Sequence, residues 1–420
     1  MKNESDDKKT CSFFYIKNTH KRGAYNMGFQ TLDNKNLTFE ELLEGAEKIG
    51  RLAEQEAKTA DENATISENV VNLIKETQIS KLMLPKKYGF PQVSFSEYAK
   101  IIRRVANYNL SAAWLTYLYP LHNTLPAYLP EVEREKIIQQ GGLICDVFAA
   151  VGKAERDGEG FRVSGKWNFA SGVLYSDWIG LGVLMEFPDS TKPEVCMPVF
   201  NRSEVEIVKN WDTFGLRGTG SNQVVVDNVY IPFDRIIRME QIEKNSRPPE
   251  EDYDHDYPYY DVPYFPAFYI GFPCIALGGA ERILQEFKIQ TEKRVRLVDG
   301  VRESESPRSQ RVMAEMMTEF HAAEGLMDKY IQLLEDSKQL GVAVPRSEFF
   351  AIRTKIIKIC TEIALRSLLT LGGGALYKGG AMELFFRDIM SVATHKTSLY
   401  EDSVAAYGLE LFGFEGGVRG

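Results

Sequence analysis

The stretch "NWDTFGLRGTGSNQVVVDNVYIP", residues 210–232, decides the fold of this chain. It begins near a tryptophan, passes through a turn of glycines and small hydroxyl residues, and ends in a β-branched run that predicts a strand. Gly218 and Gly220 have the spacing of a dinucleotide-binding turn, but residue 223 is Gln and no helical pattern follows, so that fingerprint fails. The stretch therefore predicts a turn that leads into a strand.

The residues on either side give the chain an α, β, α order. Short β-branched and aromatic runs from about 145 to 240 predict a small β domain. Helical spacing precedes it, beginning at Thr38 and Glu41, which have capping-box spacing. We therefore predict an α+β fold with five parts: a flexible arm (1–35), a helical domain (36–142), a β-barrel-like domain (143–243), an acidic Tyr- and Pro-rich joint (244–265) and an antiparallel four-helix bundle (266–420).

Two apolar stripes predict the long helices of the bundle. The first consists of Met313, Met317, Phe320, Ala323, Met327, Ile331 and Leu334, and the second of Phe349, Ile352, Ile356, Cys360, Ile363 and Leu368. Near the end of the chain, "RDIMSVATHKTSLYED", Arg387–Asp402, is a helix-like run that contains His395. This run is either a core helix or the place where the bundle presents a catalytic group.

Composition and charge favour a small-molecule partner. The 420 residues carry a formal net charge of -9, and Lys and Arg are dispersed, which argues against nucleic acid and an anionic membrane surface. Five widely separated cysteines without a CxxC pair suggest neither a disulfide framework nor a metal site. No run reaches the ~18 apolar residues of a membrane span, and the first residues lack a signal-peptide core. We expect a soluble, cytoplasmic protein.

The α, β, α order and two motifs resemble the acyl-CoA dehydrogenase superfamily of flavoproteins. One motif is "VSGKWNFASGVLYSDW", residues 163–178, which is similar to the family's strand and turn beside the flavin ring. The other keeps the family's W…G-R-T-S…V-x-V-P spacing as Trp211, Gly215, Arg217, Thr219, Ser221, Val229 and Pro232. The resemblance covers roughly residues 35–420 and implies an acyl-CoA dehydrogenase-like fold.

A flavin pocket is also sensible from the residues themselves. A flavin needs an apolar surface for its ring and hydrogen-bonding groups at its polar edge. Phe169 can stack, Ser171 can offer a hydroxyl, and Gly172 permits close approach. By resemblance, Ser171 takes the place of the family's N5-contacting threonine, and Trp211 and Thr219 shape the pocket. The alternative is a hairpin with a Ser-Gly turn and no ligand.

The usual base of an acyl-CoA dehydrogenase is missing. The family's glutamate lies eight residues after the aspartate of the "RD" pair, where this chain has Lys396, preceded by His395. The alternative glutamate site falls within "YFPAFYIGFPCIALG", which has no acid. A charged lysine is a poor general base. Dehydrogenase chemistry is therefore disfavoured.

His395 instead resembles the histidine of the two-component flavin-dependent monooxygenases, a branch that includes p-hydroxyphenylacetate hydroxylase and dibenzothiophene monooxygenase. These enzymes take reduced FMN or FAD from a separate reductase and form a C4a-hydroperoxide with O2. An imidazole exchanges protons near neutral pH, so His395 could act as the acid or base beside the substrate. His122 matches a second pocket histidine of that branch. The alternatives are a core histidine at 395 and a surface helix-end histidine at 122.

Two further groups are open to two interpretations. Arg294, with Arg296 and Arg302, could meet a flavin phosphate, but no Phe-Gly follows them as in dehydrogenases, which favours an exchangeable FMN. The joint's aromatics either line a pocket or pack the joint against the bundle: Tyr259, Tyr260, Tyr264, Phe265, Phe268 and Tyr269.

We predict a flavin-dependent monooxygenase with Ser171, His395 and His122 as catalytic residues. Its expected partners are a small-molecule substrate, O2 and a flavin reductase, and the resemblance implies a homotetramer. The first alternative is an FAD-dependent acyl-CoA dehydrogenase or oxidase, for which Glu401 is the nearest acid. The second is a binding protein that kept the fold and lost catalysis.

Overall fold

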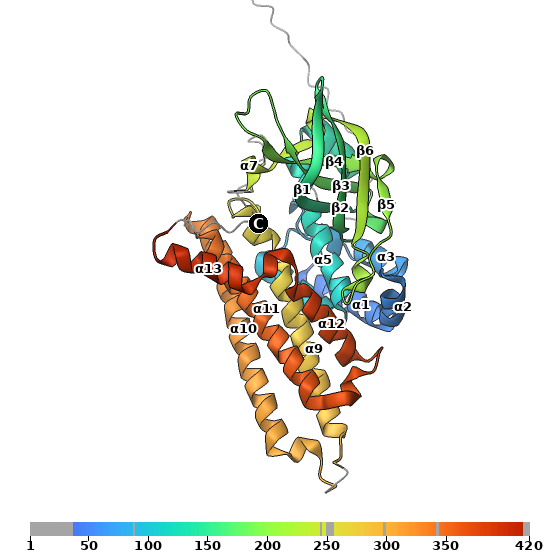
Figure 1. Ribbon diagram of the computed structural model, residues 1–420, viewed down its shortest axis with the longest axis vertical. Coiled ribbons are helices and arrows are strands. Elements are labelled where there is room, and N and C mark those ends of the chain that lie inside the picture. The colour runs from blue at the N-terminus through green and yellow to red at the C-terminus, as the bar shows by residue number, and fades with distance from the viewer. Residues whose placement is uncertain are drawn as a thin grey trace, which may run out of the picture. The chain divides into compact units, whose positions relative to one another are not determined.

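The computed structural model describes residues 37–86, 89–140, 142–243, 246–248, 256–296, 300–341 and 344–414. The predicted arm over residues 1–35 lies outside them. From Asn36 onward the chain forms one compact unit, in which helices precede and follow a single sheet (Figure 1). The predicted α+β class is confirmed. The finer division at residues 142, 243 and 265 remains our proposal.

The N-terminal helices begin where the sequence predicts. Thr38 and Glu41 form the capping box, in which each backbone N–H is bonded to the other side chain. Helix α5 is buried along its whole length and touches both strand β1 and helix α9, so it lies between the sheet and the bundle (Figure 1). The helices are α1 (Phe39–Gln55), α2 (Ala57–Asn63), α3 (Glu68–Glu76), α4 (Phe95–Ala106), α5 (Leu110–His122) and α6 (Glu131–Gln140).

The sheet has seven strands in the order β5-β6-β2-β1-β3-β4-β7. Only the β1 and β3 pair of this sheet is parallel, and its register shifts between Val147 and Gly152. From Lys153 onward the long β1 pairs with β2. Trp167 of β2 packs in the core of the sheet, whereas Trp178 of β3 packs in the core shared with the helices. The strands are β1 (Ile144–Asp157), β2 (Gly160–Ala170), β3 (Trp178–Met185), β4 (Glu194–Asn201), β5 (Glu206–Val208), β6 (Asn222–Pro232) and β7 (Ile236–Arg238).

Helices α9 to α12 form the bundle, with α13 packed on α11 (Figure 1). Each predicted stripe is buried in part and half-buried elsewhere. The buried members are Phe320, Ala323, Met327 and Leu334 of the first and Phe349, Ile356, Cys360 and Ile363 of the second. At the other three positions of the first stripe the preceding residue is the buried one: Val312, Met316 and Tyr330. The helices are α7 (Met239–Ile242), α8 (Tyr264–Phe268), α9 (Gly271–Lys293), α10 (Pro307–Leu340), α11 (Arg346–Leu371), α12 (Ala381–Ala393) and α13 (Tyr400–Leu411).

The expectation of one continuous helix through Arg387–Asp402 is wrong. Helix α12 ends at Ala393, and His395 caps a short 3-10 turn, Lys396–Ser398, before α13 begins. The imidazole accepts the backbone N–H of Thr397, a local bond that competes with helix continuation. His395 therefore lies in a turn between two helices.

Two helical segments of the described chain, Tyr264–Lys293 and Arg346–Leu376, are long and apolar enough to cross a membrane by length and composition alone. The most apolar part of the first is 89% buried and that of the second 39%. Core helices of globular proteins meet the same criterion, so this is weak evidence for a span.

Gly271, at the start of α9, packs against a ring of α5. A Cβ atom there would lie 2.0 Å from the Tyr117 ring, so Gly271→Ala should destabilise the protein by about 1–3 kcal/mol through overpacking. Gly325 in α10 has no atom within 4 Å of the same position, so Gly325→Ala should stabilise by about 0.5–1 kcal/mol. Chemical denaturation of both variants checks this, and equal effects would contradict it.

Candidate active site

A chain of hydroxyl groups links β2 to the turn before β6. Ser171 Oγ accepts the indole N–H of Trp114 at 3.0 Å and lies 2.7 Å from Ser221 Oγ. Ser221 Oγ lies 2.7 Å from Thr219 Oγ1, which donates to the carbonyl of Leu216 at 2.8 Å. All three hydroxyl residues are buried. The predicted residues Ser171 and Thr219 are therefore members of one network.

The direction of each hydrogen bond in this hydroxyl network follows from the Leu216 carbonyl, at which the network ends. A carbonyl can only accept, so Thr219 spends its single proton on Leu216 and must accept from Ser221. Ser221 then has no proton left for Ser171, and Ser171 must donate to it. Ser171 Oγ therefore remains available only as an acceptor.

Phe169 and Trp211 form an aromatic pair at the edge of this site. Their ring centroids are 6.0 Å apart at a near-perpendicular angle. Phe169 has a left-handed backbone with φ 70° and a side chain that is 70% exposed, an unusual combination for an aromatic residue. A groove of about 270 Å³ opens beside Trp211. The pair therefore places two apolar rings at right angles, one of which, Trp211, borders the groove.

Gly172 holds the turn after β2 close to α5. Its φ is 72°, its N–H donates to the carbonyl of Thr219 at 2.9 Å, and its carbonyl accepts the hydroxyl of Tyr119 at 3.0 Å. A Cβ atom here would lie 2.4 Å from that hydroxyl oxygen. The close approach that the sequence predicts at Gly172 is made to α5, and it positions Ser171.

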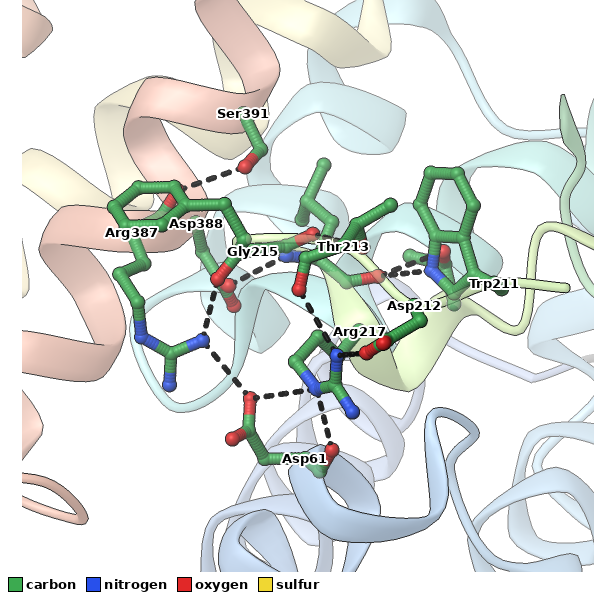
Figure 2. Close-up of polar contacts among 12 residues, drawn as sticks. Asp61, Trp211, Asp212, Thr213, Gly215, Arg217, Arg387, Asp388 and Ser391 are labelled. Carbon is green, nitrogen blue, oxygen red and sulfur yellow. Dashed lines mark hydrogen bonds and ion pairs between the residues drawn. The ribbon is translucent and has the colours of Figure 1, made fainter.

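The "RD" pair of α12 fastens this region to the bundle (Figure 2). Arg387 donates to the Phe214 carbonyl at 2.7 Å and forms an ion pair with Asp61 at 3.1 Å. Asp388 accepts the N–H of Leu216 at 2.7 Å. Burial raises the pKa of Asp388 to about 7, although the Leu216 N–H opposes that shift.

Arg217 completes the network from the side of the turn. Its guanidinium donates to the Asp61 carbonyl at 2.7 Å and to the Asp212 carboxylate at 2.6 Å (Figure 2). Gly215 lies against α12 so closely that a Cβ atom would be 2.4 Å from the Arg387 carbonyl oxygen. The glycine and the arginine of the predicted motif therefore serve the attachment of this turn.

His395 lies near Trp114, the residue whose indole N–H is bonded to Ser171. Its ring centroid is 6.0 Å from Trp114 and 4.7 Å from Phe272. Because Nδ1 accepts the Thr397 N–H, the neutral ring carries its proton on Nε2. Burial, together with the nearby charge of Arg353, lowers the pKa of His395 to about 4. The side chain is therefore a neutral hydrogen-bond donor at physiological pH.

His122 is buried and bonded to a carboxyl group. Nδ1 lies 3.2 Å from the Ile144 carbonyl, so it carries a proton, and Nε2 lies 3.3 Å from Asp146 Oδ1. Burial lowers the pKa of His122 to about 3 and raises the pKa of Asp146. We conclude that the proton between them resides on Asp146, giving an uncharged pair. The alternative of a surface helix-end histidine at 122 is wrong, because His122 is buried.

The structure does not bring Arg294 to this site within one chain. It follows the last residue of α9, whereas Phe272 lies near the first, and the intervening helix is roughly 33 Å long. Arg294 donates to the Leu371 carbonyl at 3.0 Å. A role in binding flavin phosphate stays a prediction that would need another subunit.

The joint's aromatics are mostly buried and pack on each other and on the N-terminal helices. Tyr259 meets Phe95, and Tyr264 meets Tyr128, at centroid distances of 6.4 and 6.2 Å. Phe268 stacks on His122 at 5.6 Å. The packing interpretation therefore holds for Tyr259 and Tyr264, while Phe268 faces the candidate site.

Sequence reasoning missed Trp114, Asp146 and Arg353. Trp114 lies in an apolar helix and had no distinguishing signal. Asp146 interrupts the otherwise apolar start of β1, and Arg353 interrupts the buried stripe of α11, since it lies four residues after Phe349 and seven before Cys360. A charged residue on a buried face is a usable signal for a site.

The chain is similar in sequence to known proteins. Residues 270–398 match the family model described as acyl-CoA dehydrogenase, C-terminal domain. The chain is 26% identical over 380 residues to the p-hydroxyphenylacetate 3-hydroxylase, oxygenase component, of Acinetobacter baumannii, covering 88% of this chain and 89% of that protein. It is 23% identical over 368 residues to the indole-3-acetate monooxygenase of the same species, covering 84% and 90%.

A solved structure shows the same fold. The structure of XiaF from Streptomyces sp. in complex with FADH2 and glycerol matches with a TM-score of 0.83 at 20% identity, covering 91% of this chain and 97% of that chain. The predicted acyl-CoA dehydrogenase-like fold is confirmed.

The buried carboxyl of Asp388 gives a pH-dependent prediction. Its folded-state pKa lies above the ordinary value, so the stability it contributes is present below about pH 4 and is lost as the pH rises toward 7. Asp388→Asn keeps an acceptor oxygen and does not ionise. Its free energy of unfolding, measured by chemical denaturation, should therefore rise relative to that of the unsubstituted protein by roughly 3 kcal/mol between pH 5 and pH 8.

Asp388→Ala is the matched control for this prediction. It removes the acceptor of the Leu216 N–H and should cost about 1–3 kcal/mol at pH 5. A difference between Asp388→Asn and the unsubstituted protein that does not change with pH would show that Asp388 is ionised throughout.

Proposed function

We propose that this chain, a member of the acyl-CoA dehydrogenase superfamily in its branch of flavin-dependent monooxygenases, inserts one oxygen atom of O2 into a small aromatic substrate and uses a reduced flavin. The relatives named above are a hydroxylase and a monooxygenase of aromatic compounds. The observation that carries the proposal is the directed hydroxyl chain that leaves Ser171 as an acceptor beside the Phe169 and Trp211 rings.

The residues at this site fit a flavin. Phe169 holds an aromatic ring in solvent at the expense of a left-handed backbone, which is typical of a residue that a ligand covers. Trp211 supplies a second ring, and Ser171 supplies a polar atom at its buried end. We propose that these three residues hold the isoalloxazine, with Gly172 and Thr219 fixing Ser171 behind them.

The proton direction at Ser171 favours the reduced form of the cofactor. Reduced flavin carries a hydrogen on N5, whereas oxidised flavin presents a bare N5 that needs a donor. Ser171 Oγ can accept the first and, with its proton committed to Ser221, cannot serve the second. When bound, the reduced flavin, FMN or FAD, supplies the two electrons that activate O2. A separate flavin reductase would supply it.

His395 and the His122 and Asp146 pair would manage protons around the substrate. His395 Nε2–H can donate a hydrogen bond at neutral pH because its ring stays uncharged. Asp146 holds a proton that can pass to His122 without creating net charge in the interior. The surrounding rings of Phe268 and Phe272 exclude water from both groups.

The dehydrogenase alternative lacks its base in the described part of the chain. Glu401, the nearest acid by sequence, is exposed on α13. Asp146, the buried acid on the Phe268 side of the site, is held protonated beside His122. The buried Asp388 of α12 accepts the N–H of Leu216, so none of these three carboxyl groups is a free base for a substrate α-proton.

Assembly and location remain proposals. We propose a homotetramer, since large apolar side chains of α11 and the following turn stand exposed: Leu365, Leu369, Leu376 and Tyr377. Burial of such a patch between subunits would be favourable. We propose a cytoplasmic location, with four free cysteines, all buried, among the described residues.

Flavin affinity tests the proton direction. Anaerobic titration should show that reduced flavin binds more tightly than oxidised flavin. Ser221→Ala frees the Ser171 proton for an oxidised N5, so the ratio of the two dissociation constants should fall about 5-fold, the size of one net hydrogen bond. Ser203→Ala, an exposed hydroxyl on the same half of the protein, should leave the ratio unchanged. An unchanged ratio in Ser221→Ala would overturn the assignment.

Rapid mixing with oxygen tests the activity. The protein loaded with reduced flavin should give a transient near-ultraviolet absorbing species before the spectrum of oxidised flavin appears. Ser171→Ala and His395→Ala should shorten its lifetime at least about 10-fold, since each removes a polar contact in a dry site. His321→Ala, an exposed histidine on α10, is the control. Immediate reoxidation in the unsubstituted protein, or flavin bleached by an acyl-CoA, would contradict the proposal.

A further inference from the structure

Arg353 of α11 is a fully buried guanidinium inside the bundle. The residue is 0% exposed. Its Cζ atom lies 4.3 Å from the ring centroid of Phe350, 4.8 Å from that of Tyr269 and 5.6 Å from that of Phe272. These rings enclose the cation and bind it through cation–π contacts.

The hydrogen-bonding capacity of Arg353 is mostly unused. Nη2 donates to the carbonyl of Thr397, while Nε and Nη1 have no partner among the described residues. No carboxylate in the described ranges lies within ion-pair distance of this side chain. Nη2 has two hydrogens, one on the edge that it shares with Nε and one on the edge that it shares with Nη1. Whichever of them bonds to Thr397, the other edge keeps two parallel N–H donors.

The phenols around Arg353 do not neutralise its charge. Burial raises the pKa of each of them, so all three are uncharged at neutral pH: Tyr117, Tyr269 and Tyr330. Burial also lowers the pKa of Arg353, but from so high a value that it stays protonated.

The other titratable side chains of the interior are no counter-ions either. His395 is neutral, and Asp146 shares its proton with His122, so that pair has no net charge. An unpaired buried cation is costly, and buried charges in proteins are paired. Among the described residues, Arg353 is therefore a buried positive charge without a carboxylate partner.

Arg353 adjoins the candidate active site. The ring of Phe272 touches both Arg353 and His395, with a centroid distance of 4.7 Å to the imidazole. Arg346, two turns earlier on the same face of α11, lies over the rings of Phe265 and Phe350 at 4.5 and 5.0 Å and is only partly buried. The two arginines form a positive path from the surface to His395.

We propose that Arg353 is the receptor for the carboxylate of an aromatic acid and that this acid is the substrate. The unused two-donor edge matches a carboxylate, and the surrounding rings match an aromatic body. Arg346 draws the anion inward. This inference rests on the proposed function, because it places the substrate beside Arg353 and His395.

Calorimetric titration of the full-length protein, loaded anaerobically with reduced flavin, tests the proposal without any variant. The probes are 4-hydroxyphenylacetate and indole-3-acetate, each paired with its primary amide, which has nearly the same shape and no charge. Each acid should bind at least about 30-fold more tightly than its amide, the lower limit expected for a buried charged pair. Equal affinities of acid and amide would overturn the proposal.

Substitutions at Arg353 test whether this side chain causes the preference for acids over amides. Arg353→Met keeps the length of the side chain and removes the charge, so it should weaken binding of both acids about 30-fold or more and leave the amides nearly unchanged. Arg353→Lys should restore part of the preference. Arg366→Met is the matched control, since Arg366 lies on the same helix and pairs with Glu315 at the surface. Undiminished binding of acids by a folded Arg353→Met protein would overturn the assignment.

The two proposals fail separately. The oxygen-mixing experiment needs no substrate, so loss of its transient species defeats the monooxygenase and leaves the acid preference to be measured. A transient species together with equal binding of acids and amides defeats the carboxylate receptor and leaves the monooxygenase intact.

Discussion

Leu216 holds the two halves of the site together through its backbone N–H and carbonyl. Its N–H is taken by Asp388 of the bundle, and its carbonyl accepts both the Thr219 hydroxyl and the Trp211 indole at 2.8 and 3.0 Å. Leu216 has a left-handed backbone, φ 51°, which a leucine adopts only when its surroundings fix it. The position of the Trp211 ring and the direction of the hydrogen bonds among the hydroxyl groups both depend on the backbone of this one residue.

Ion pairs are concentrated outside the site, and Arg353 is the buried side chain beside it that keeps its charge. Arg387, Arg217 and Asp61 form their ion pairs at the attachment of the turn to α12 and α2, where solvent reaches them. Inside, the imidazoles and carboxyl groups are driven to uncharged forms by burial. Polar groups in such a site keep fixed hydrogen-bond directions, because no mobile charge reorients them.

Most of the fold followed from local sequence, and most of the site did not. Capping boxes, turn residues and apolar periods depend on neighbours in the chain, so the start of α1 and the α, β, α order were predictable. The motifs of residues 163–178 and 210–232 contain all three members of the hydroxyl network. Asp146 and Trp114 become polar partners only through contacts with distant residues, His122 and Ser171, and no local pattern contains that information.

Arg353 shows what a sequence does contain about a site. A helix formed only for packing would place an apolar residue at that position, between Phe349 and Ile357, and replacing a buried charge by an apolar group is often neutral or stabilising. The rings and the Thr397 carbonyl offset only part of the cost of burying this guanidinium, and under our proposal the carboxylate of the substrate offsets the rest. The same reasoning separates Arg353 from Arg387, whose partners are all within the chain. A buried charge that the protein satisfies itself is architecture, and one that it leaves unsatisfied points to what the protein binds.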